Sequence, residues 1–179
     1  TCSAVRHRLS YLPQEVRRQG VILYLHGGGY CCGGLSYASG VGAMLASLTG
    51  ARVFSPAYRL APEHPFPAAL EDALESYRYL LQKGYEVHYI GTEKGVEADK
   101  LSAIEGITYH AVKSGKLRRY FDWKNFTDPF KVIYGAFQSA HLMGKLKPDV
   151  CFSKGGFVAV PVVFGAWLHR IPVVSHESD

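Results

Sequence analysis

VILYLHGGGY, residues 21–30, is a short apolar stretch that passes directly into three consecutive glycines. Its β-branched and aromatic residues favour a buried strand, and the glycines that follow favour a loop. Backbone N–H groups can converge on one ligand oxygen in such a loop, because no Cβ atom blocks the approach. We therefore expect Gly27, Gly28 and Gly29 to bind an oxyanion or a phosphate, and the alternative is a plain tight turn.

Apolar runs and turn signals alternate along the rest of the chain. Besides the strand at 21–25, the pattern predicts strands at 4–12, 52–55, 86–90, 107–112, 150–153 and 171–175, and helices at 36–48, 67–83, 96–105, 128–146 and 157–169. This order predicts the α/β class, as a three-layer Rossmann-like sandwich with a mostly parallel sheet in a single domain, 1–179. The face predicted to be buried on the helix at 67–83 comprises Ala69, Leu70, Ala73, Leu74, Tyr77 and Leu81.

Composition excludes several classes of protein. With 179 residues, 47% hydrophobic and 20% charged, the chain is neither disordered nor collagen-like. Four cysteines, with Cys31 adjacent to Cys32 and no CxxC pair, predict neither a disulfide scaffold nor a zinc site. A net charge of +5, spread over both halves, does not indicate a nucleic-acid partner. We expect no metal, no cofactor and a cytoplasmic location.

Residues of about 20–82 carry a specific family resemblance. VILYLHGGGY at 21–30 and SPAYRLAPEHPFPAALEDALESYRYLL at 55–81 resemble the hormone-sensitive-lipase-like α/β-hydrolase esterases. The resemblance implies a hydrolase-like segment at 1–83, with VILYL as a central strand and the amides of Gly27, Gly28 and Gly29 as an oxyanion hole. The GxSxG nucleophile motif of that family does not occur in this sequence. An unconventional nucleophile would have to come from Cys31, Cys32 or Ser36.

Residues 84–179 resemble a different family. The segments that carry this resemblance are GYEVHYIGTEKGVEADKL at 84–101, SGKLRRYFDWKNFTDPF at 114–130, KPDVCFSKGGFVAVPVV at 147–163 and IPVVSHESD at 171–179. They are similar to the N-terminal acceptor domain of MurG-type glycosyltransferases, the UDP-N-acetylglucosamine transferases of peptidoglycan synthesis. The resemblance implies acceptor binding by Ser114, Gly115, Lys116, Gly155, Gly156, Phe157, His176 and Glu177. The family's first glycine loop and its donor-binding domain have no counterpart here, so we expect no complete transfer reaction.

The segment at 114–130 also mixes basic and aromatic residues. Such a mixture suits the surface of an anionic membrane, and the candidates are Lys116, Arg118, Arg119, Trp123 and Lys124. A loop with packed aromatics and solvated charges explains the same residues equally well.

Together these patterns predict a hybrid of an α/β-hydrolase fragment and a glycosyltransferase N-domain fragment. We expect it to lack a complete active site and not to act as an enzyme in this form, its parent classes being carboxylesterases and hexosyltransferases. One alternative is residual carboxylic ester hydrolysis; another is an acceptor-binding or membrane-surface module at the inner face of the membrane. The strand at 21–25 or 52–55 is expected to replace the transferase's missing first strand. Expected partners are a small ester or anionic ligand, an anionic membrane surface, and a second copy bound through an exposed sheet edge.

Overall fold

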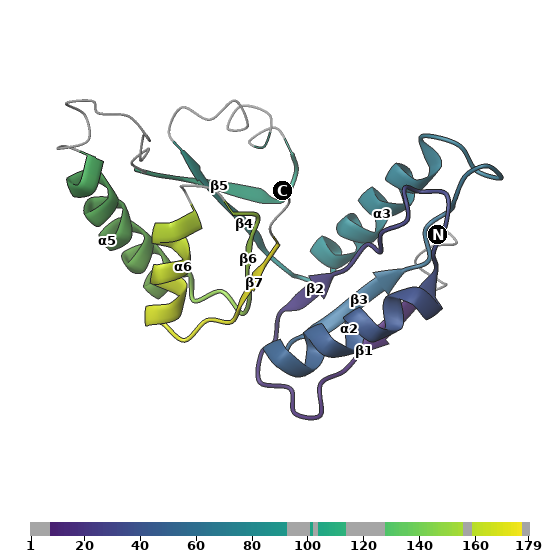
Figure 1. The fold of residues 1–179 in the computed structure, drawn as a ribbon, viewed down its shortest axis with the longest axis horizontal. Coiled ribbons are helices and arrows are strands. Elements are labelled where there is room, and N and C mark those ends of the chain that lie inside the picture. The colour runs from purple at the N-terminus through teal and green to yellow at the C-terminus, as the bar shows by residue number, and fades with distance from the viewer. Residues whose placement is uncertain (1–7, 93–100, 102–103, 114–127, 156–158, 177–179) are drawn as a thin grey trace. The chain divides into compact units, whose positions relative to one another are not determined.

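The computed structural model describes residues 8–92, 101, 104–113, 128–155 and 159–176. The chain forms two compact units, Thr1–Tyr85 and Glu86–Asp179, which are coloured purple to teal and teal to yellow in Figure 1. The predicted junction after residue 83 lies close to this boundary. The single domain over 1–179 stays a prediction, and each unit is described by itself.

The first unit is built around a three-stranded sheet. Its strands are β1 (Arg8–Tyr11), β2 (Val21–Leu23) and β3 (Arg52–Pro56), in the order β1-β3-β2. Strand β2 runs parallel to β3, whereas β1 runs antiparallel to it. The helices of this unit are α2 (Leu35–Thr49) and α3 (Ala68–Gln82). Gly50 ends α2 in the left-handed conformation, which a glycine adopts without a Cβ penalty.

The two helices cover opposite faces of this sheet. Tyr11 pairs with Val53 and lies against α2, because a Cβ atom at Gly42 would lie 2.4 Å from the Tyr11 ring. Phe54 instead stacks on Tyr79 of α3, with ring centroids 5.8 Å apart. Successive side chains of a strand point to opposite faces, so Val53 faces α2 and Phe54 faces α3. The unit therefore has three layers, as Figure 1 shows.

The buried face of α3 differs from the predicted one. The helix buries Ala68, Asp72, Ser76 and Leu80, while Leu70 and Leu74 of the predicted face are 49% and 42% exposed. The cause is that Asp72 and Ser76 satisfy their polar atoms inside the unit. Arg59 binds the Asp72 carboxylate, and the Ser76 hydroxyl donates to the Asp72 carbonyl at 2.8 Å. Hydrophobic spacing misplaces a helix face when paired polar residues are the buried ones.

The second unit contains two parallel strand pairs and two helices. Strand β4 (Val87–Thr92) pairs with β5 (Ile107–Val112), and β6 (Cys151–Ser153) pairs with β7 (Val173–Ser175). The helices are α5 (Asp128–Leu146) and α6 (Ala159–Leu168). The predicted helix at 96–105 falls largely outside the described residues.

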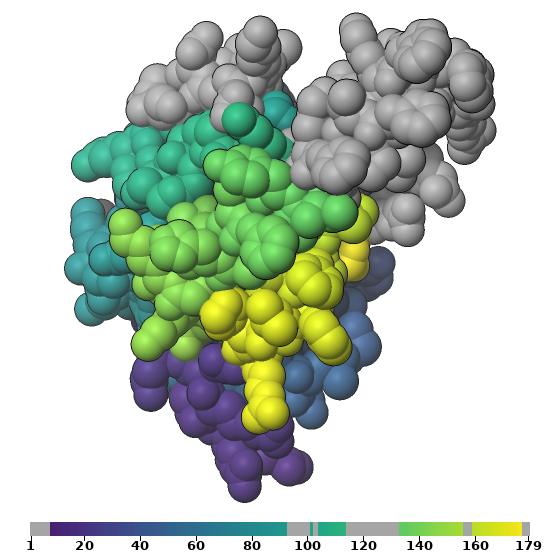
Figure 2. All heavy atoms as spheres, turned by 90° about the vertical axis from the view of Figure 1, so that its left-hand side faces the viewer, coloured from purple at the N-terminus to yellow at the C-terminus, as the bar shows by residue number. Residues whose placement is uncertain are grey.

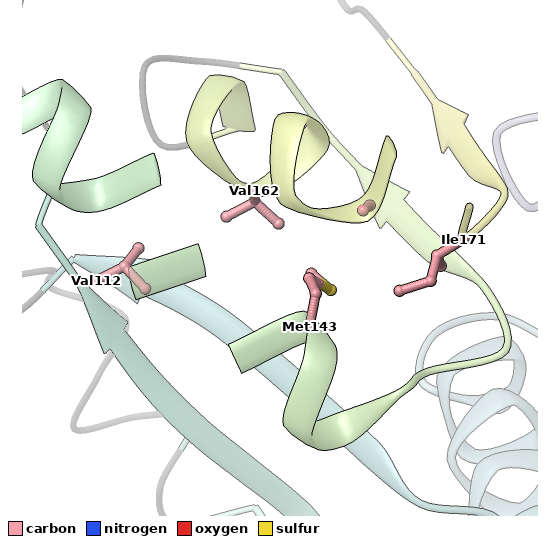
Figure 3. Packing of buried hydrophobic residues seen from close by; sticks show 5 residues of the cluster. Val112, Met143, Val162 and Ile171 are labelled. Carbon is pink, nitrogen blue, oxygen red and sulfur yellow. The ribbon is translucent and has the colours of Figure 1, made fainter. Parts of the chain in front are cut away.

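The core of this unit lies between its helices and strands. It comprises Val112, Met143, Val162, Ala166 and Ile171, and Figure 3 shows Met143 of α5 among the other side chains. Helices α5 and α6 approach closely, since a Cβ atom at Gly165 would lie 2.9 Å from the backbone nitrogen of Ala140. The Met143 side chain of α5 is 2% exposed, so water does not reach it in this core.

The α/β class and the mostly parallel pairing are confirmed, but the pairing differs from the expected single sheet. The described strands form three separate sheets. Within the first unit β2 and β3 pair with each other, and β3 also pairs with β1. That the strand at 21–25 or 52–55 replaces the first strand of the transferase stays a prediction. Within the described ranges, no helix is long and apolar enough to cross a membrane.

Candidate functional site

The glycine loop begins at the end of β2 and leads into α2. Its first residue, His26, is 5% exposed and stacks on Tyr58, with ring centroids 4.3 Å apart. The Tyr58 hydroxyl donates a short hydrogen bond to the His26 carbonyl. Burial raises the pKa of Tyr58, and the nearby Tyr30, Tyr24 and Cys32 raise it further. The phenol therefore keeps its proton and remains a donor to the loop.

A second hydrogen bond fixes the tautomer of His26. Its Nδ1 atom lies 2.8 Å from the Gly27 carbonyl oxygen and 3.1 Å from the Tyr58 hydroxyl oxygen. Because a carbonyl can only accept, Nδ1 carries the proton and donates it to Gly27. The imidazole is thereby held as part of the loop's own hydrogen-bond network.

The next two carbonyls accept hydrogen bonds from the adjacent cysteines. The Gly28 carbonyl accepts from the backbone N–H groups of Cys31, at 3.1 Å, and Cys32, at 3.2 Å. The thiols also donate to carbonyls of the loop. The Cys32 thiol donates to the Gly28 carbonyl at 3.2 Å, and the Cys31 thiol donates to the Gly29 carbonyl at 3.3 Å. Every carbonyl from His26 to Gly29 thus has a donor from within the first unit.

The amides of Gly27, Gly28 and Gly29 show the opposite pattern. Within the described part of the chain none of the three N–H groups has a hydrogen-bond acceptor. The C=O and N–H of a trans peptide point in opposite directions, and the cis bonds of the described segments are both X-Pro bonds outside this loop. Each glycine amide therefore points away from a carbonyl that is already occupied. A run of exposed donors with satisfied carbonyls favours an anion or a polarised carbonyl oxygen.

At two positions of the loop and its exit, a side chain larger than that of glycine would clash. Gly28 has a φ of 131°, and a Cβ atom there would lie 2.0 Å from the Cys32 carbonyl oxygen. Gly33 has a φ of 103°, and a Cβ atom there would meet the His26 ring at 2.7 Å. A Cβ atom at Gly27 or Gly29 would have no neighbour within 4 Å, so the space beside these two residues is open.

A partly buried ion pair, Arg59 with Asp72, lies next to the segment that holds the loop. The Asp72 carboxylate, which is fully buried, accepts from the Arg59 backbone N–H at 2.8 Å and from its guanidinium at 2.9 Å. These bonds, together with the neighbouring Glu71, raise the pKa of Arg59 above its usual value. Two residues further on, the Ala61 N–H donates to the Tyr30 carbonyl at 2.8 Å and ties this segment to the glycine loop.

The predicted nucleophile candidates lie beside the glycine loop, at Cys31 and Cys32, and in the first turn of α2, at Ser36. Both thiols lie on the carbonyl side of the Gly28 and Gly29 peptides, opposite to the amides of Gly29 and Tyr30. Ser36 is exposed, and its carbonyl accepts from the Ser39 hydroxyl at 2.7 Å. Across the described residues, no serine or cysteine side chain is hydrogen bonded to a histidine.

Two acceptor-binding candidates of the second unit lie close together. The Gly155 N–H donates to the Ser153 hydroxyl at 3.3 Å, and the His176 N–H donates to the Ser153 carbonyl at 2.9 Å. Both residues follow the carboxyl ends of β6 and β7, where ligands of parallel sheets bind. The other acceptor candidates lie outside the described residues: Ser114, Gly115, Lys116, Gly156, Phe157 and Glu177. The same holds for the membrane-surface candidates Lys116, Arg118, Arg119, Trp123 and Lys124.

The sequence analysis missed three features of the described residues. The first is the set Tyr58, Arg59 and Asp72, since Asp72 is one of four charged residues in α3 and its spacing does not distinguish it from the exposed ones. An open groove of about 500 Å³ lies beside α5 and the end of α6, whose adjoining surfaces Figure 2 shows in green and yellow. It is lined by Phe137, Ala140, His141, Gly144, Lys145 and His169.

The third missed feature is a histidine pair across β4 and β5. His88 Nδ1 lies 3.1 Å from His110 Nε2, and Glu86 lies 3.6 Å from the other ring nitrogen of His88. Burial, His88 and Lys145 lower the pKa of His110.

Comparison with known proteins finds two families in the chain, and their matches overlap at residues 73–103, a range that includes the predicted junction. The glycosyltransferase family 28 N-terminal domain matches residues 73–179, and the alpha/beta hydrolase fold family matches residues 22–103. The UDP-N-acetylglucosamine–N-acetylmuramyl-(pentapeptide) pyrophosphoryl-undecaprenol N-acetylglucosamine transferase of Clostridium kluyveri is 62% identical over 100 residues. That match covers 56% of this chain and 28% of the transferase.

Solved structures from both families are also similar to this chain. A hormone-sensitive lipase from a metagenome library is 44% identical over 38% of this chain and 24% of its own, with a TM-score of 0.36. MurG of Acinetobacter baumannii is 23% identical over 89% of this chain and 34% of its own, with a TM-score of 0.44. The chain therefore belongs, through residues 73–179, to the glycosyltransferase family 28 N-terminal domain family, and it joins to this domain a segment of the alpha/beta hydrolase fold.

Proposed function

We propose that this chain is a hybrid α/β protein whose glycine loop binds the carbonyl oxygen of an ester, or a small oxyanion, without catalysing hydrolysis. The observation that supports the proposal is the contrast between the carbonyls and the amides of the loop. Carbonyls from His26 to Gly29 are occupied from within, while the amides of Gly27, Gly28 and Gly29 have no acceptor in the described part of the chain. Such donors stabilise negative charge on a bound oxygen.

Turnover needs more than these donors. Nucleophilic catalysis requires an activated nucleophile within hydrogen-bond reach of a base, and a third group to orient the base. His26 donates through Nδ1 to the loop itself, and the thiols of Cys31 and Cys32 lie behind the peptides rather than beside the amides. The loop therefore retains the stabilising part of an esterase mechanism and lacks the bond-forming part.

Binding and turnover are measured separately to test this proposal. Backbone amide NMR with butyrate as the probe should shift the Gly27, Gly28 and Gly29 signals. Gly28→Ala, which places a methyl group against the Cys32 carbonyl, should abolish the shifts of Gly27 and Gly29, and Gly40→Ala, whose Cβ atom meets nothing within 4 Å, should leave all three unchanged. Hydrolysis of p-nitrophenyl butyrate should not exceed the rate in buffer. Saturable turnover that Cys31→Ala, Cys32→Ala or Ser36→Ala abolishes would refute the proposal.

A second candidate function rests on the transferase segment. Sequence identity of 62% with an enzyme that glycosylates a pyrophosphoryl-undecaprenol acceptor favours binding of a lipid-linked pyrophosphate by the second unit. Gly155 and His176 follow the ends of β6 and β7, where ligands of parallel sheets bind, which supports this candidate. Co-sedimentation with vesicles containing undecaprenyl pyrophosphate, against vesicles of equal charge made with phosphatidylglycerol, tests it. Equal binding to both, lost in Arg118→Glu plus Arg119→Glu, would instead indicate a general anionic-surface module.

A further inference from the structure

The histidine pair of the second unit lies on one face of the strand pair β4 and β5. The register sets Thr108 opposite His88, and side chains two positions apart on a strand share a face, so His110 lies diagonally across from His88. Two positions further along the same face, Val112 belongs to the core of this unit and Ile90 packs against that core. Both rings are therefore carried by paired strands that the core holds in place.

The contact between the two rings needs one lone pair and one proton, because His88 Nδ1 lies 3.1 Å from His110 Nε2. Glu86 lies 3.6 Å from the other ring nitrogen of His88, and a carboxylate favours the proton on the nitrogen that it faces. His88 therefore presents the lone pair of Nδ1, and His110 donates through Nε2. The ring planes are inclined by 41°, so the rings meet at their nitrogen atoms and do not stack.

We propose that His88 and His110 bind one divalent transition-metal ion of the kind that prefers imidazole ligands, such as Zn²⁺, Cu²⁺ or Ni²⁺. Metal–nitrogen bonds of about 2.0–2.1 Å, at angles of about 90–110°, place two ligand nitrogens about 2.9–3.4 Å apart. The observed separation of 3.1 Å lies within this range, so the strands need not move. On binding, the metal takes both lone pairs, and His110 adopts the tautomer that carries its proton on Nδ1.

The surroundings contain one group that supports the metal and one that opposes it. A metal-bound histidine usually donates its other N–H to a carboxylate, and Glu86 lies on that side of His88. Burial, His88 and Lys145 lower the pKa of His110, so this ring is neutral at neutral pH and keeps a lone pair. The Lys145 ammonium repels a cation, but its side chain is exposed, so solvent and salt weaken the repulsion.

The proposed site has two protein ligands. Within the described ranges, no group of three or more histidine, cysteine, aspartate or glutamate side chains could hold a metal ion. Binding is therefore expected to be weaker than at a structural zinc site with four protein ligands. The proposal departs from the expectation of no metal, because the two histidines belong to different strands and their spacing along the chain matches no metal-binding motif.

Titration with Zn²⁺, followed by nitrogen NMR of the histidine rings, tests the proposal. Each of the eight histidines gives its own signals, so zinc bound by the cysteines does not obscure the result. The signals of His88 Nδ1 and His110 Nε2 should move together along one saturating curve. His141 and His169, which line the groove beside α5, are controls within the same unit and should not follow that curve.

Single substitutions separate metal binding from a structural role of the pair. His110→Gln should weaken the response of His88 to Zn²⁺ by about tenfold or more, since one of the two ligands is lost. Lys145→Gln should strengthen binding by about threefold, because it removes a nearby like charge at an exposed position. Lys147→Gln, at another exposed lysine, is the matched control and should leave binding unchanged.

The remaining outcomes contradict the proposal. Movement of His88 without His110, or equal movement of His141 and His169, would show adventitious zinc binding only. Unchanged zinc binding in His110→Gln would likewise overturn the proposed site. Circular dichroism identifies a variant that fails to fold, and the titration of the unsubstituted chain then still decides the question.

Discussion

Gly165→Ala tests whether the second unit depends on the close approach of α5 and α6. An added Cβ atom would lie 2.9 Å from the Ala140 nitrogen and 2.9 and 3.0 Å from the carbonyl carbon and oxygen of Ser139. All three are backbone atoms, which cannot rotate away as a side chain can. Ordinary contact is about 3.5 Å or more, so the helices must separate by roughly 0.5 Å.

The magnitude follows from two opposing effects. Alanine in place of glycine stabilises a helix interior by about 1 kcal/mol. Overpacking costs about 1–3 kcal/mol, and a gap of about 0.5 Å also forfeits roughly a quarter of the dispersion energy across the interface. Ser139 and Ala166 at this interface are fully buried, so water does not fill the gap. We expect a net loss of about 1–2 kcal/mol in the free energy of unfolding.

Urea unfolding followed by tryptophan fluorescence measures this loss, since Trp123 and Trp167 both belong to the second unit. With a slope of about 2 kcal/mol per M, the midpoint should fall by roughly 0.5–1 M. Gly40→Ala is the control: its Cβ atom has no neighbour within 4 Å, so circular dichroism should show the first unit stabilised by about 0.5–1 kcal/mol. An unchanged or raised midpoint for Gly165→Ala would refute the packing argument.

Three further changes have defined outcomes. Tyr58→Phe leaves the buried His26 carbonyl without its donor and should destabilise the first unit by about 1–3 kcal/mol in thermal unfolding; an unchanged melting temperature would contradict this. Met143→Ala opens a cavity in the second core and should cost about 2–5 kcal/mol in urea, whereas a loss below about 1 kcal/mol would mean that the core collapses around it. Because the pKa of His110 is lowered on folding, the unfolded chain binds the proton more readily. The second unit should therefore keep its stability above pH 6.5 and lose it as the pH falls further, and His110→Gln should flatten this dependence in urea midpoints.

Local sequence patterns predict the elements of this fold well. The predicted helix at 36–48 is α2, Leu35–Thr49, and the predicted strand at 107–112 is β5, Ile107–Val112. Glycines adjoin both elements: Gly34 and Gly50 lie at the ends of α2, and Gly106 precedes β5. The backbone preference of a glycine acts within a few residues. Helix 128–146 matches α5 for the same reason, since Pro148 follows it closely.

What sequence patterns did not predict depends on contacts between distant residues. The buried face of α3 is set by Arg59, thirteen positions before Asp72, and hydrophobic spacing carries no information about such a pair. The separate strand pairs have the same origin: alternation of strands and helices predicts parallel neighbours, but not which strands share a sheet. His88 and His110 meet because the β4–β5 register pairs His88 with Thr108, which places His110 diagonally opposite His88 on the same face of the sheet.

The same distinction bears on the proposed function, which is binding without turnover. The donors of the loop are backbone amides, and the groups that hold them in place are Tyr58, the adjacent cysteines and glycines that admit unusual backbone angles. These groups lie within residues 26–58, and the Arg59–Asp72 pair and the Ala61 N–H that also hold the loop belong to the first unit as well. A nucleophile, its base and an orienting acid are instead side chains that a fold must bring together from separate segments. Joining two families at α3 preserves what is local on each side of the joint, so anion binding is the property of the esterase segment that this chain is best able to retain.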